Sequence, residues 1–429
     1  MIEILPIGLL LVLFVLGMPI GIGLGISGLV GLYLVGGLDV TTGLLALTPY
    51  RESASFILSS VPMFILMAEF ATRGGLVRDL YDAAHSWLGH YPGGLGLAAV
   101  ASCAAMGAMS GASTAAAAAV AGASMREMDR YGYNRAFSSG TIASGGTLAI
   151  MIPPSIPMVI YGVQTQTSIG QLFVAGIVPG IITMFAYMIT VWAWVSLRPG
   201  IAPRVAPKPV LERVRALRHV WAVLMLVVLI IGGMYGGLFT PTEAGAVGAG
   251  GALAITLVLG RLRLGQIKPA LYSAAVTTAM LMTIVVGAHF FSFYLTLAGV
   301  TGAVSAFISG LPMSPIFTMI LIIVPIYIVL GMFMDNVPIL LLTLPVLFPV
   351  VTQMGYDPIW FGVIVVALGE IGLITPPVGL SVFVVSSVAR VPLEDVFKGI
   401  TPFLLADAGC LALFIAVPTI ATFLPNLMR

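Results

Sequence analysis

Apolar segments follow one another along nearly the whole chain, and short polar stretches separate them. Residues 7–16, 221–231 and 411–424 consist mostly of hydrophobic side chains. Apolar segments of about 20 residues have the length at which a helix spans a bilayer, and only lipid or a membrane-embedded bundle accommodates so many of them. The pattern therefore predicts an all-α polytopic membrane protein.

The composition agrees with a membrane protein and excludes an ordinary soluble domain. Of the 429 residues, 59% are hydrophobic and 8% are charged, whereas soluble domains carry about 25% charged residues. The first apolar run follows Glu3 and lacks a basic leader, so we interpret it as a retained span and not as a signal peptide. Cys103 and Cys410 both lie in apolar segments, which predicts free structural thiols.

Two apolar segments contain a Pro-Pro pair, at Pro153–Pro154 and at Pro376–Pro377. The second pair follows the first at an offset in numbering of 376 − 153 = 223, and the stretch 176–179 resembles 399–402 at the same offset. Proline removes a backbone donor and clashes with the preceding turn, so each pair breaks its helix. In lipid such a break is tolerated only where the freed backbone lines a cavity or meets protein. Two broken helices at corresponding positions of two repeats point to the substrate and ion site of a secondary transporter.

The basic residues predict the orientation of the spans. Sixteen of the 18 Lys and Arg fall into five clusters, and only Arg51 and Arg429 lie elsewhere. Because short loops rich in Lys and Arg face the cytoplasm, we assign all five clusters to that side. The clusters are Arg73 and Arg78; Arg126, Arg130 and Arg135; residues 198–218; Arg261, Arg263 and Lys268; and Arg390 and Lys398.

Two segments then begin and end on the same side of the membrane. Residues 95–124 lie between two cytoplasmic loops, and about 30 residues are too few for two crossings of about 20 residues each. Residues 315–351 lie in the same way between two outer loops. Both segments are therefore predicted to be re-entrant hairpins.

The chain thus divides into an inverted-topology repeat with two re-entrant hairpins and two broken helices. Residues 198–219 are rich in Pro and basic side chains, which predicts a cytoplasmic linker that ends in a short basic amphipathic helix. We expect both termini in the periplasm. The expected spans are 5–17, 18–37, 54–72, 137–163 and 171–196 in the first half, and 220–239, 241–259, 270–298, 359–388 and 400–424 in the second, the breaks falling in 137–163 and 359–388.

The hairpin tips and the two breaks supply the candidate site. Ser113 in one tip aligns with Asn336 in the other at the same offset, since 336 − 113 = 223. Unwound carbonyls and hydroxyls suit Na⁺, expected near Ser113, Asn336 and Thr375, while the N-termini of half-helices suit the carboxylate of an organic acid. The candidate residues are Ser110, Gly111, Ser113, Thr114, Gly146, Pro153, Pro154, Ser155, Asp335, Asn336, Thr375, Pro376, Pro377 and Gly379.

Several polar residues have structural alternatives. The hydroxyls of Ser113 and Thr114 could bond back to their own helix, whereas a carboxylate at Asp335, in mid-hairpin, is functional by default. Glu370 suits either a functional role or the role of a structural partner. For the remaining polar residues we expect structural roles: helix capping for Glu243, a bundle-facing position for His289, and no function for Glu69 and Asp407.

Motifs of enzymes and nucleotide-driven pumps are missing from the sequence. It contains neither a HExxH motif, nor a phosphate-binding GxxxxGK[ST] loop, nor clustered Cys and His ligands. We therefore expect no catalytic function, no organic cofactor and no nucleic-acid partner. An ion gradient remains as the source of energy.

The chain resembles the large membrane subunit of tripartite ATP-independent periplasmic (TRAP) transporters over essentially its full length. Chance does not explain so many matching segments. The most specific ones are GMPIGIGLGISG at 17–28, SVPMF at 60–64, NRAFSSGTIASGGTLAIMIPPS at 134–155, LFTPTEAGAVGA at 238–249, GMFMDNVPILLLTLP at 331–345 and GEIGLITPPVG at 369–379.

The resemblance implies an assembly and a mechanism. It implies a small membrane subunit of four spans, here expected as a separate chain, and a periplasmic substrate-binding protein, in the inner membrane of a bacterial cell. It further implies uptake of an organic anion driven by Na⁺, through an elevator motion of a transport domain against a scaffold. The expected scaffold comprises residues 1–90 and 220–300, the transport domain residues 91–197 and 301–429, and the linker residues 198–219.

Two other functions remain open at this point. A stand-alone Na⁺/carboxylate symporter of related architecture would carry the same breaks and hairpins. A proton-conducting or structural subunit of a membrane complex would need charged residues along several spans, and the sequence has few. The sequence does not decide whether the substrate is a four-carbon dicarboxylate, sialic acid, another sugar acid or a keto acid.

Overall fold

The computed structural model describes residues 5–428, apart from the side chains of His219 and Ser309, so Glu3 and Arg429 lie outside the described residues. Helices make up nearly all of this part, which contains no strand. The elements are α1 Leu5–Val15, α2 Ile20–Ser53, α3 Ser60–Arg73, α4 Leu76–Leu88, α5 Gly94–Ser110, α6 Ser113–Arg130, α7 Arg135–Met151, α8 Ile156–Thr165, α9 Ile169–Leu197, η2 Pro199–Ile201, α10 Val210–Val227, η3 Val228–Gly232, α11 Gly233–Tyr235, α12 Pro241–Val258, α13 Leu264–Leu297, α14 Val300–Ser309, α15 Pro315–Thr318, η4 Met319–Ile323, α16 Val324–Gly331, α17 Asn336–Gln353, α18 Pro358–Ile374, α19 Leu380–Ala389, α20 Leu393–Ala416 and α21 Thr419–Asn426.

The two halves repeat the same elements at the offset found in the sequence. Helix α17 begins and ends at this offset from α6 (336 − 113 = 223 and 353 − 130 = 223), and α18 follows α7 in the same way. The caps repeat too, because the side chains of Asn134 and Asp357 accept hydrogen bonds from the first turns of α7 and α18. The all-α architecture with two hairpins, α5–α6 and α15/α16–α17, and two broken helices, α7–α8 and α18–α19, is therefore confirmed.

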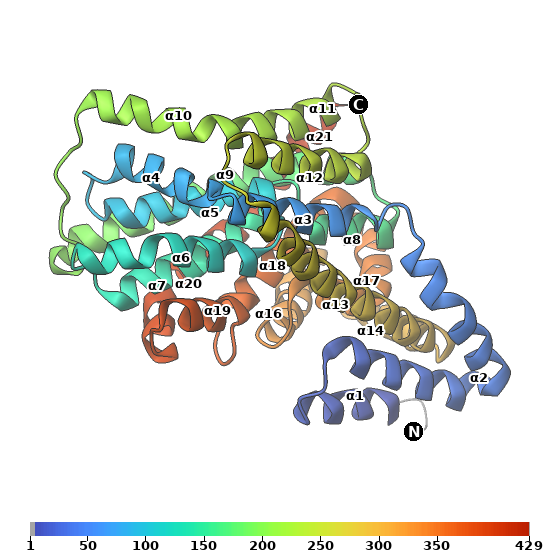
Figure 1. The fold of residues 1–429 in the computed structure, drawn as a ribbon. Coiled ribbons are helices and arrows are strands. Elements are labelled where there is room, and N and C mark those ends of the chain that lie inside the picture. Colours follow the sequence, from blue (N-terminus) through green and yellow to red (C-terminus); the bar gives the residue numbers. More distant parts are fainter. Residues whose placement is uncertain (1–4, 429) are drawn as a thin grey trace.

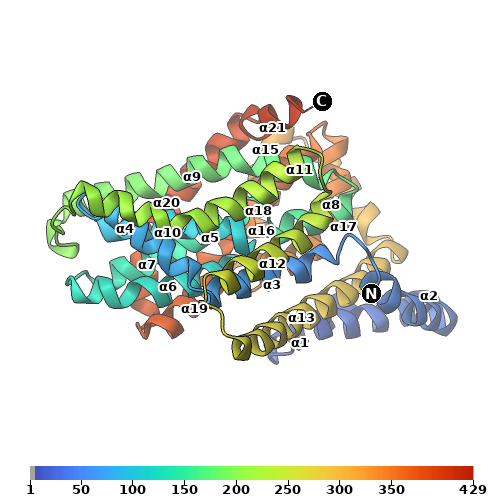
Figure 2. The ribbon, with the colours of Figure 1, turned by 45° about the horizontal axis from the view of Figure 1, so that its top comes forward.

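The hairpins and broken helices of the two halves interlock into one group of helices. Helix α6 packs against α19, and its counterpart α17 packs against α8. In Figures 1 and 2 hairpin α5–α6 extends towards the left and α17 lies towards the right, with α18 between them. Helix α7 crosses α20 so closely that neither Gly140 nor Gly399 has room for a Cβ atom.

The other long helices form a second group, in which α2 packs along α13 and α3 packs against α12 and α13. A Cβ atom at Gly21 would lie 2.7 Å from the backbone nitrogen of Ile284, so α2 approaches α13 backbone to backbone. Figure 1 shows α1, α2 and α13 together at the lower right. Within residues 5–428 five helices are long and apolar enough to cross a membrane, and three bent pairs raise that number to eight.

Three helices depart from the predicted spans. The second span was expected to end at 37, but α2 continues to Ser53 beyond a break at Gly37, where φ is 78° and ψ is −176°. Only glycine adopts this backbone conformation readily, so the interruption is confined to this residue and the helix continues after it. Helix α3 is followed, after a bend of 62°, by α4, and α14 follows α13. Neither α4 nor α14 was predicted; the charges of α4 concealed the apolar face, including Leu76 and Tyr81, that it buries.

Several of the basic loops gather at one end of the molecule. Arg261, between α12 and α13, forms an ion pair with Asp79 of α4. Lys208 of the linker donates to the Ser86 hydroxyl of α4 over 3.2 Å, and the backbone N–H of Asn134 donates to the linker carbonyl of Ile201 over 2.8 Å. The linker, the α6–α7 turn and the α12–α13 turn therefore share one face. The location of that face in the cytoplasm stays a prediction.

Candidate functional site

A cavity of about 530 Å³ lies where the two groups of helices meet, at the tips of both hairpins. This volume is in the range of about 300–1,000 Å³ that holds small ligands. One wall is formed by the hairpin tips with the starts of α6, α8 and α17, and the other by α3 and α13. The lining residues are Ile65, Ala68, Glu69, Thr72, Ser110, Gly111, Ala112, Ser113, Thr114, Ala115, Ala118, Ala119, Ile150, Ile156, Pro157, Thr277, Met280, Leu281, Asp335, Val337 and Val384.

Each hairpin tip is tied by one backbone hydrogen bond to a broken helix. Gly111 ends α5 in the left-handed region, with φ of 61°, and its carbonyl accepts from the N–H of Ile156 over 3.2 Å. In the second half the N–H of Gly379, also at φ of 61°, donates to the carbonyl of Met332 over 3.2 Å. Both tips are thereby fixed to the unwound segments that interrupt the helices.

Three helices begin at the wall of the large cavity. Ser113 is the first residue of α6, Ile156 the first of α8, and Val337 the second of α17. No side chain caps the start of α6, so its first N–H groups remain open to a ligand. The start of α8 is capped by Ser155 and the start of α17 by Asp335. The α6 start therefore offers the free donors and partial positive charge that suit an anion, and the dipole of α8 adds to them.

The charged side chains of the cavity wall are acidic. Glu69 on α3 accepts from Arg73 over 2.8 Å and from the hydroxyl of Ser273 over 2.7 Å. Asp335 accepts from the backbone N–H of Asn336 over 2.7 Å, as the N-cap of α17. Within the described residues no Lys or Arg lines this cavity. Arg73 already pairs with Glu69, so Asp335 is the carboxylate of this wall that has no basic partner among the described residues.

Asn336 lies directly beneath the second tip and is fully buried. Its Nδ2 donates to the carbonyl of Val366 over 3.0 Å and to Oε1 of Glu370 over 3.3 Å. The hydroxyl of Ser113, the counterpart of Asn336, also lies beside Glu370, although without a hydrogen bond of normal geometry. The two aligned tip residues thus converge on one carboxylate of α18.

Paired glycines make this convergence possible. A Cβ atom at Gly146 would lie 3.1 Å from the carbonyl oxygen of Ser113, and one at Gly369 would lie 2.5 Å from Oδ1 of Asn336. Gly146 and Gly369 occupy matching positions of the repeat, since 369 − 146 = 223 is again the same offset. Each one leaves the space into which a hairpin tip fits.

The structure distributes the fourteen candidate residues over three locations. Ser110, Gly111, Ser113, Thr114 and Asp335 line the large cavity, and Gly146 and Asn336 lie beneath its wall. The others form the breaks: Pro153, Pro154 and Ser155 are buried, Thr375 bonds back to the carbonyl of Ile371 over 2.6 Å, Pro376 and Pro377 are exposed, and Gly379 contacts the second hairpin.

Other residues were interpreted from the sequence as structural. The capping role of Glu243 is confirmed by its reciprocal bonds with Thr240, and Cys103 and Cys410 are free and buried. His289 faces the helix bundle, as expected, and its Nε2 lies 3.4 Å from Oε2 of Glu52. Glu69 received no function from the sequence, yet it lies on the wall of the large cavity. An acidic residue in an apolar helix was the signal that could have identified it.

Comparisons with known proteins agree on one family. Residues 7–420 match the family described as the DctM component of tripartite ATP-independent periplasmic transporters. The chain is 38% identical to the C4-dicarboxylate TRAP transporter large permease protein DctM of Pseudomonas aeruginosa, over 94% of this chain and 93% of that protein. It is 35% identical to the isethionate TRAP transporter permease protein DctMQ of Oleidesulfovibrio alaskensis, over 99% of this chain and 66% of that protein.

A solved structure shares the fold. The YdaH transporter of Alcanivorax borkumensis matches with a TM-score of 0.63, over 88% of this chain and 89% of that one. At 13% sequence identity this likeness concerns the fold alone.

Proposed function

Because this chain belongs to the family of DctM components of tripartite ATP-independent periplasmic transporters, we propose that it imports an organic acid together with Na⁺. Members of the family are permease subunits of transporters, so the chain is a transporter subunit and not an enzyme.

The single observation that carries the substrate class is the uncapped start of α6, beside the start of α8, at the wall of a cavity without a basic lining residue in the described part of the chain. A carboxylate accepts hydrogen bonds from several N–H groups at once, and the helix dipoles favour its charge. The relatives are named for a C4-dicarboxylate and for isethionate, which are both organic anions. A small organic acid therefore fits the proposed site.

Sodium is the proposed coupling ion, bound near Ser113, Asn336 and Thr375. Na⁺ prefers oxygen ligands, and the Ser113 hydroxyl and Oδ1 of Asn336 have no hydrogen-bond partner in the described part of the chain. The Thr375 hydroxyl, which donates to Ile371, still has a lone pair to offer. Asp335, which unlike Glu69 has no basic partner among the described residues, faces the same cavity as the proposed anion. A bound cation offsets this repulsion, which gives a physical reason for substrate and ion to bind together.

The proposed motion is an elevator movement of one group of helices past the other. The interlocked hairpins and broken helices would move as one body, because they pack on each other from both halves of the chain. The large cavity lies between this body and the walls formed by α3 and α13. Its position at the border between the groups supports the division into transport domain and scaffold.

The proposed assembly includes a small membrane subunit and a periplasmic substrate-binding protein, in the inner membrane of a bacterial cell. The relative named DctMQ extends well beyond the part that this chain matches, which supports a second membrane component. Both termini are proposed to lie in the periplasm, opposite the face that gathers basic loops.

The decisive experiment is uptake of radiolabelled C4-dicarboxylate into proteoliposomes that contain this chain and its small subunit, with the loaded binding protein outside. We expect uptake only with an inward Na⁺ gradient. Equal uptake with choline in place of Na⁺ would reject the coupling ion. A second arm omits the binding protein and the small subunit: undiminished Na⁺-driven uptake by the chain alone would favour a stand-alone carboxylate symporter.

A further inference from the structure

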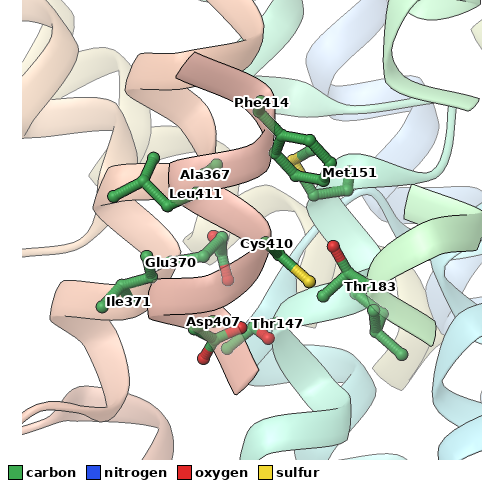
Figure 3. A pocket seen from close by; sticks show the side chains of 11 residues that line it. Thr147, Met151, Thr183, Ala367, Glu370, Ile371, Asp407, Cys410, Leu411 and Phe414 are labelled. Atoms are coloured by element: carbon green, nitrogen blue, oxygen red, sulfur yellow. The ribbon is translucent and has the colours of Figure 1, made fainter. Parts of the chain in front are cut away.

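A second, much smaller cavity lies inside the group of hairpins and broken helices (Figure 3). Its volume is about 20 Å³, and a single water molecule needs at least about 10–15 Å³ on this measure. The walls come from α7, α9, α18 and α20, two helices from each half, and they share no residue with the walls of the large cavity. The polar lining residues are Thr147, Thr183, Glu370, Asp407 and Cys410.

Two carboxylates of this small cavity each have an oxygen without a hydrogen-bond partner. Asp407 accepts from the hydroxyl of Tyr187 over 2.6 Å through Oδ1, but its Oδ2 is unpartnered. Glu370 accepts from Asn336 through Oε1, and its Oε2 is unpartnered. The two residues are 6% and 4% exposed. In the described part of the chain, neither forms an ion pair with Lys, Arg or His.

The small cavity brings together matching positions of the two repeats. Glu370 corresponds to Thr147 (370 − 223 = 147), and Cys410 corresponds to Tyr187 (410 − 223 = 187). At these two positions the first half supplies the hydroxyls of Thr147 and Tyr187, and the second half supplies the carboxylate of Glu370 and the thiol of Cys410. Asp407 adds a second carboxylate from α20, so the negative charge comes from the second half only. Figure 3 shows the side chains of Glu370, Asp407 and Thr147 close to one another around this space.

We infer that the small cavity binds one Na⁺ ion, held by the carboxylates of Glu370 and Asp407 and by the hydroxyl oxygens of Thr147 and Thr183. A buried carboxylate is stable only when it is paired, hydrogen-bonded or bound to a cation, and hard cations prefer oxygen ligands. Residues 5–428 contain no group of three or more His, Cys, Asp or Glu placed to hold a metal ion. The choice of Na⁺ rests on the proposed function, which already couples uptake to this ion, and the interior ion is additional to those proposed at the tips.

This interior ion would connect the two hairpins. Glu370 holds Asn336 of the second tip through Nδ2 at 3.3 Å, and it lies beside Ser113 of the first tip. A cation on Oε2 would fix the carboxylate in the orientation that both tips contact. Occupancy of the small cavity would therefore stabilise the arrangement in which both tips contact Glu370.

Equilibrium binding of ²²Na⁺ to the purified full-length chain tests the inference. The variants Glu370→Gln and Asp407→Asn remove one negative charge each and keep the shape of the side chain. We expect each variant to bind one Na⁺ fewer per chain than the wild type. Asp395→Asn is the matched control, because Asp395 is an exposed acidic residue paired with Lys398, and we expect the wild-type number of ions.

A wild-type number of ions bound with wild-type affinity by a folded Asp407→Asn variant would overturn the inference. Such a result would leave the ions proposed at the hairpin tips untouched, because their ligands are not altered. Should the acidic variants not fold, Thr183→Val decides the question, since it keeps the side-chain shape and removes one proposed ligand. A Kd for one ion raised tenfold or more supports the interior site, and unchanged binding rejects it.

Discussion

Asn336, at the start of α17, donates a hydrogen bond from Nδ2 to Oε1 of Glu370 in the middle of α18, across 3.3 Å. Both side chains are almost completely buried, and the same amide also donates to the carbonyl of Val366 over 3.0 Å. The tip of a hairpin is thereby fastened to the helix that carries the second break. The contact links α18 directly to the start of α17, whose neighbouring residues Asp335 and Val337 line the large cavity.

Replacing Asn336 with Ala should weaken this connection. The substitution removes both hydrogen bonds and leaves Glu370 with no donor from the tip, which costs about 1.5–3 kcal/mol for a bond to a charged group. We expect a lower melting temperature in detergent and loss of Na⁺-driven uptake. Wild-type uptake by Asn336→Ala would show that the tip does not act through Glu370.

Asp335→Ala tests the carboxylate that lines the large cavity. Because this side chain faces the proposed substrate and ion, we expect Na⁺-dependent uptake to fall about tenfold or more, equivalent to about 1.4 kcal/mol or more. Uptake per molecule of folded protein in proteoliposomes measures the effect. Asp395→Ala, an exposed acidic residue of α20, is the control and should transport normally. Unimpaired uptake by Asp335→Ala would remove this residue from the site.

Gly111→Ala tests the backbone of the first hairpin tip. Gly111 has φ of 61°, and a Cβ atom would lie 2.7 Å from the carbonyl oxygen of Pro154. The left-handed conformation alone costs about 1–2 kcal/mol for other residues, so we expect a less stable protein with impaired uptake. Gly122→Ala in α6 is the matched control, because a Cβ atom there meets nothing within 4 Å. Equal melting temperatures of the two variants would contradict the requirement for glycine at position 111.

Thr240→Ala separates stability from transport. Thr240 and Glu243 cap the start of α12 with reciprocal hydrogen bonds, far along the chain from the hairpins and breaks. Loss of such a cap costs about 1 kcal/mol. We expect a lower melting temperature but unchanged uptake per folded molecule. A selective loss of uptake, with stability unchanged, would show that this helix start has a part in transport.

The elements that depend on local rules were predictable from the sequence. Pro-Pro pairs break helices wherever they occur, so the interruptions of α7–α8 and α18–α19 fall where expected. A segment of about 30 residues that begins and ends on the same side is too short for two crossings and must form a hairpin. Helices α5 and α6 turn at the predicted tip. Helix α4 is amphipathic, with Leu76, Leu80 and Tyr81 on one buried face, but its charged residues distinguish it from a membrane span, so it was not predicted. That face packs against α5 and α10.

The location of the acidic residues could not be predicted in the same way. Glu69, Glu370 and Asp407 lie on three different helices, and nothing in the local sequence shows that one faces the large cavity and two face the small one. The repeat aligns Thr147 with Glu370, yet alignment in sequence does not establish proximity in space. Packing of α7 against α18 and α20 decides that proximity.

The sequence by itself determined the membrane class, the two-fold repeat and the positions of tips and breaks, because hydrophobic length, proline geometry and residue separation are properties of the chain. Tertiary structure decided which of these segments meet. The crossing of α7 with α18 and α20 places two carboxylates around one small cavity, and the meeting of hairpin tips with α3 and α13 creates the large one. Such contacts arise from packing between distant segments, which depends on the shapes of both partners at once.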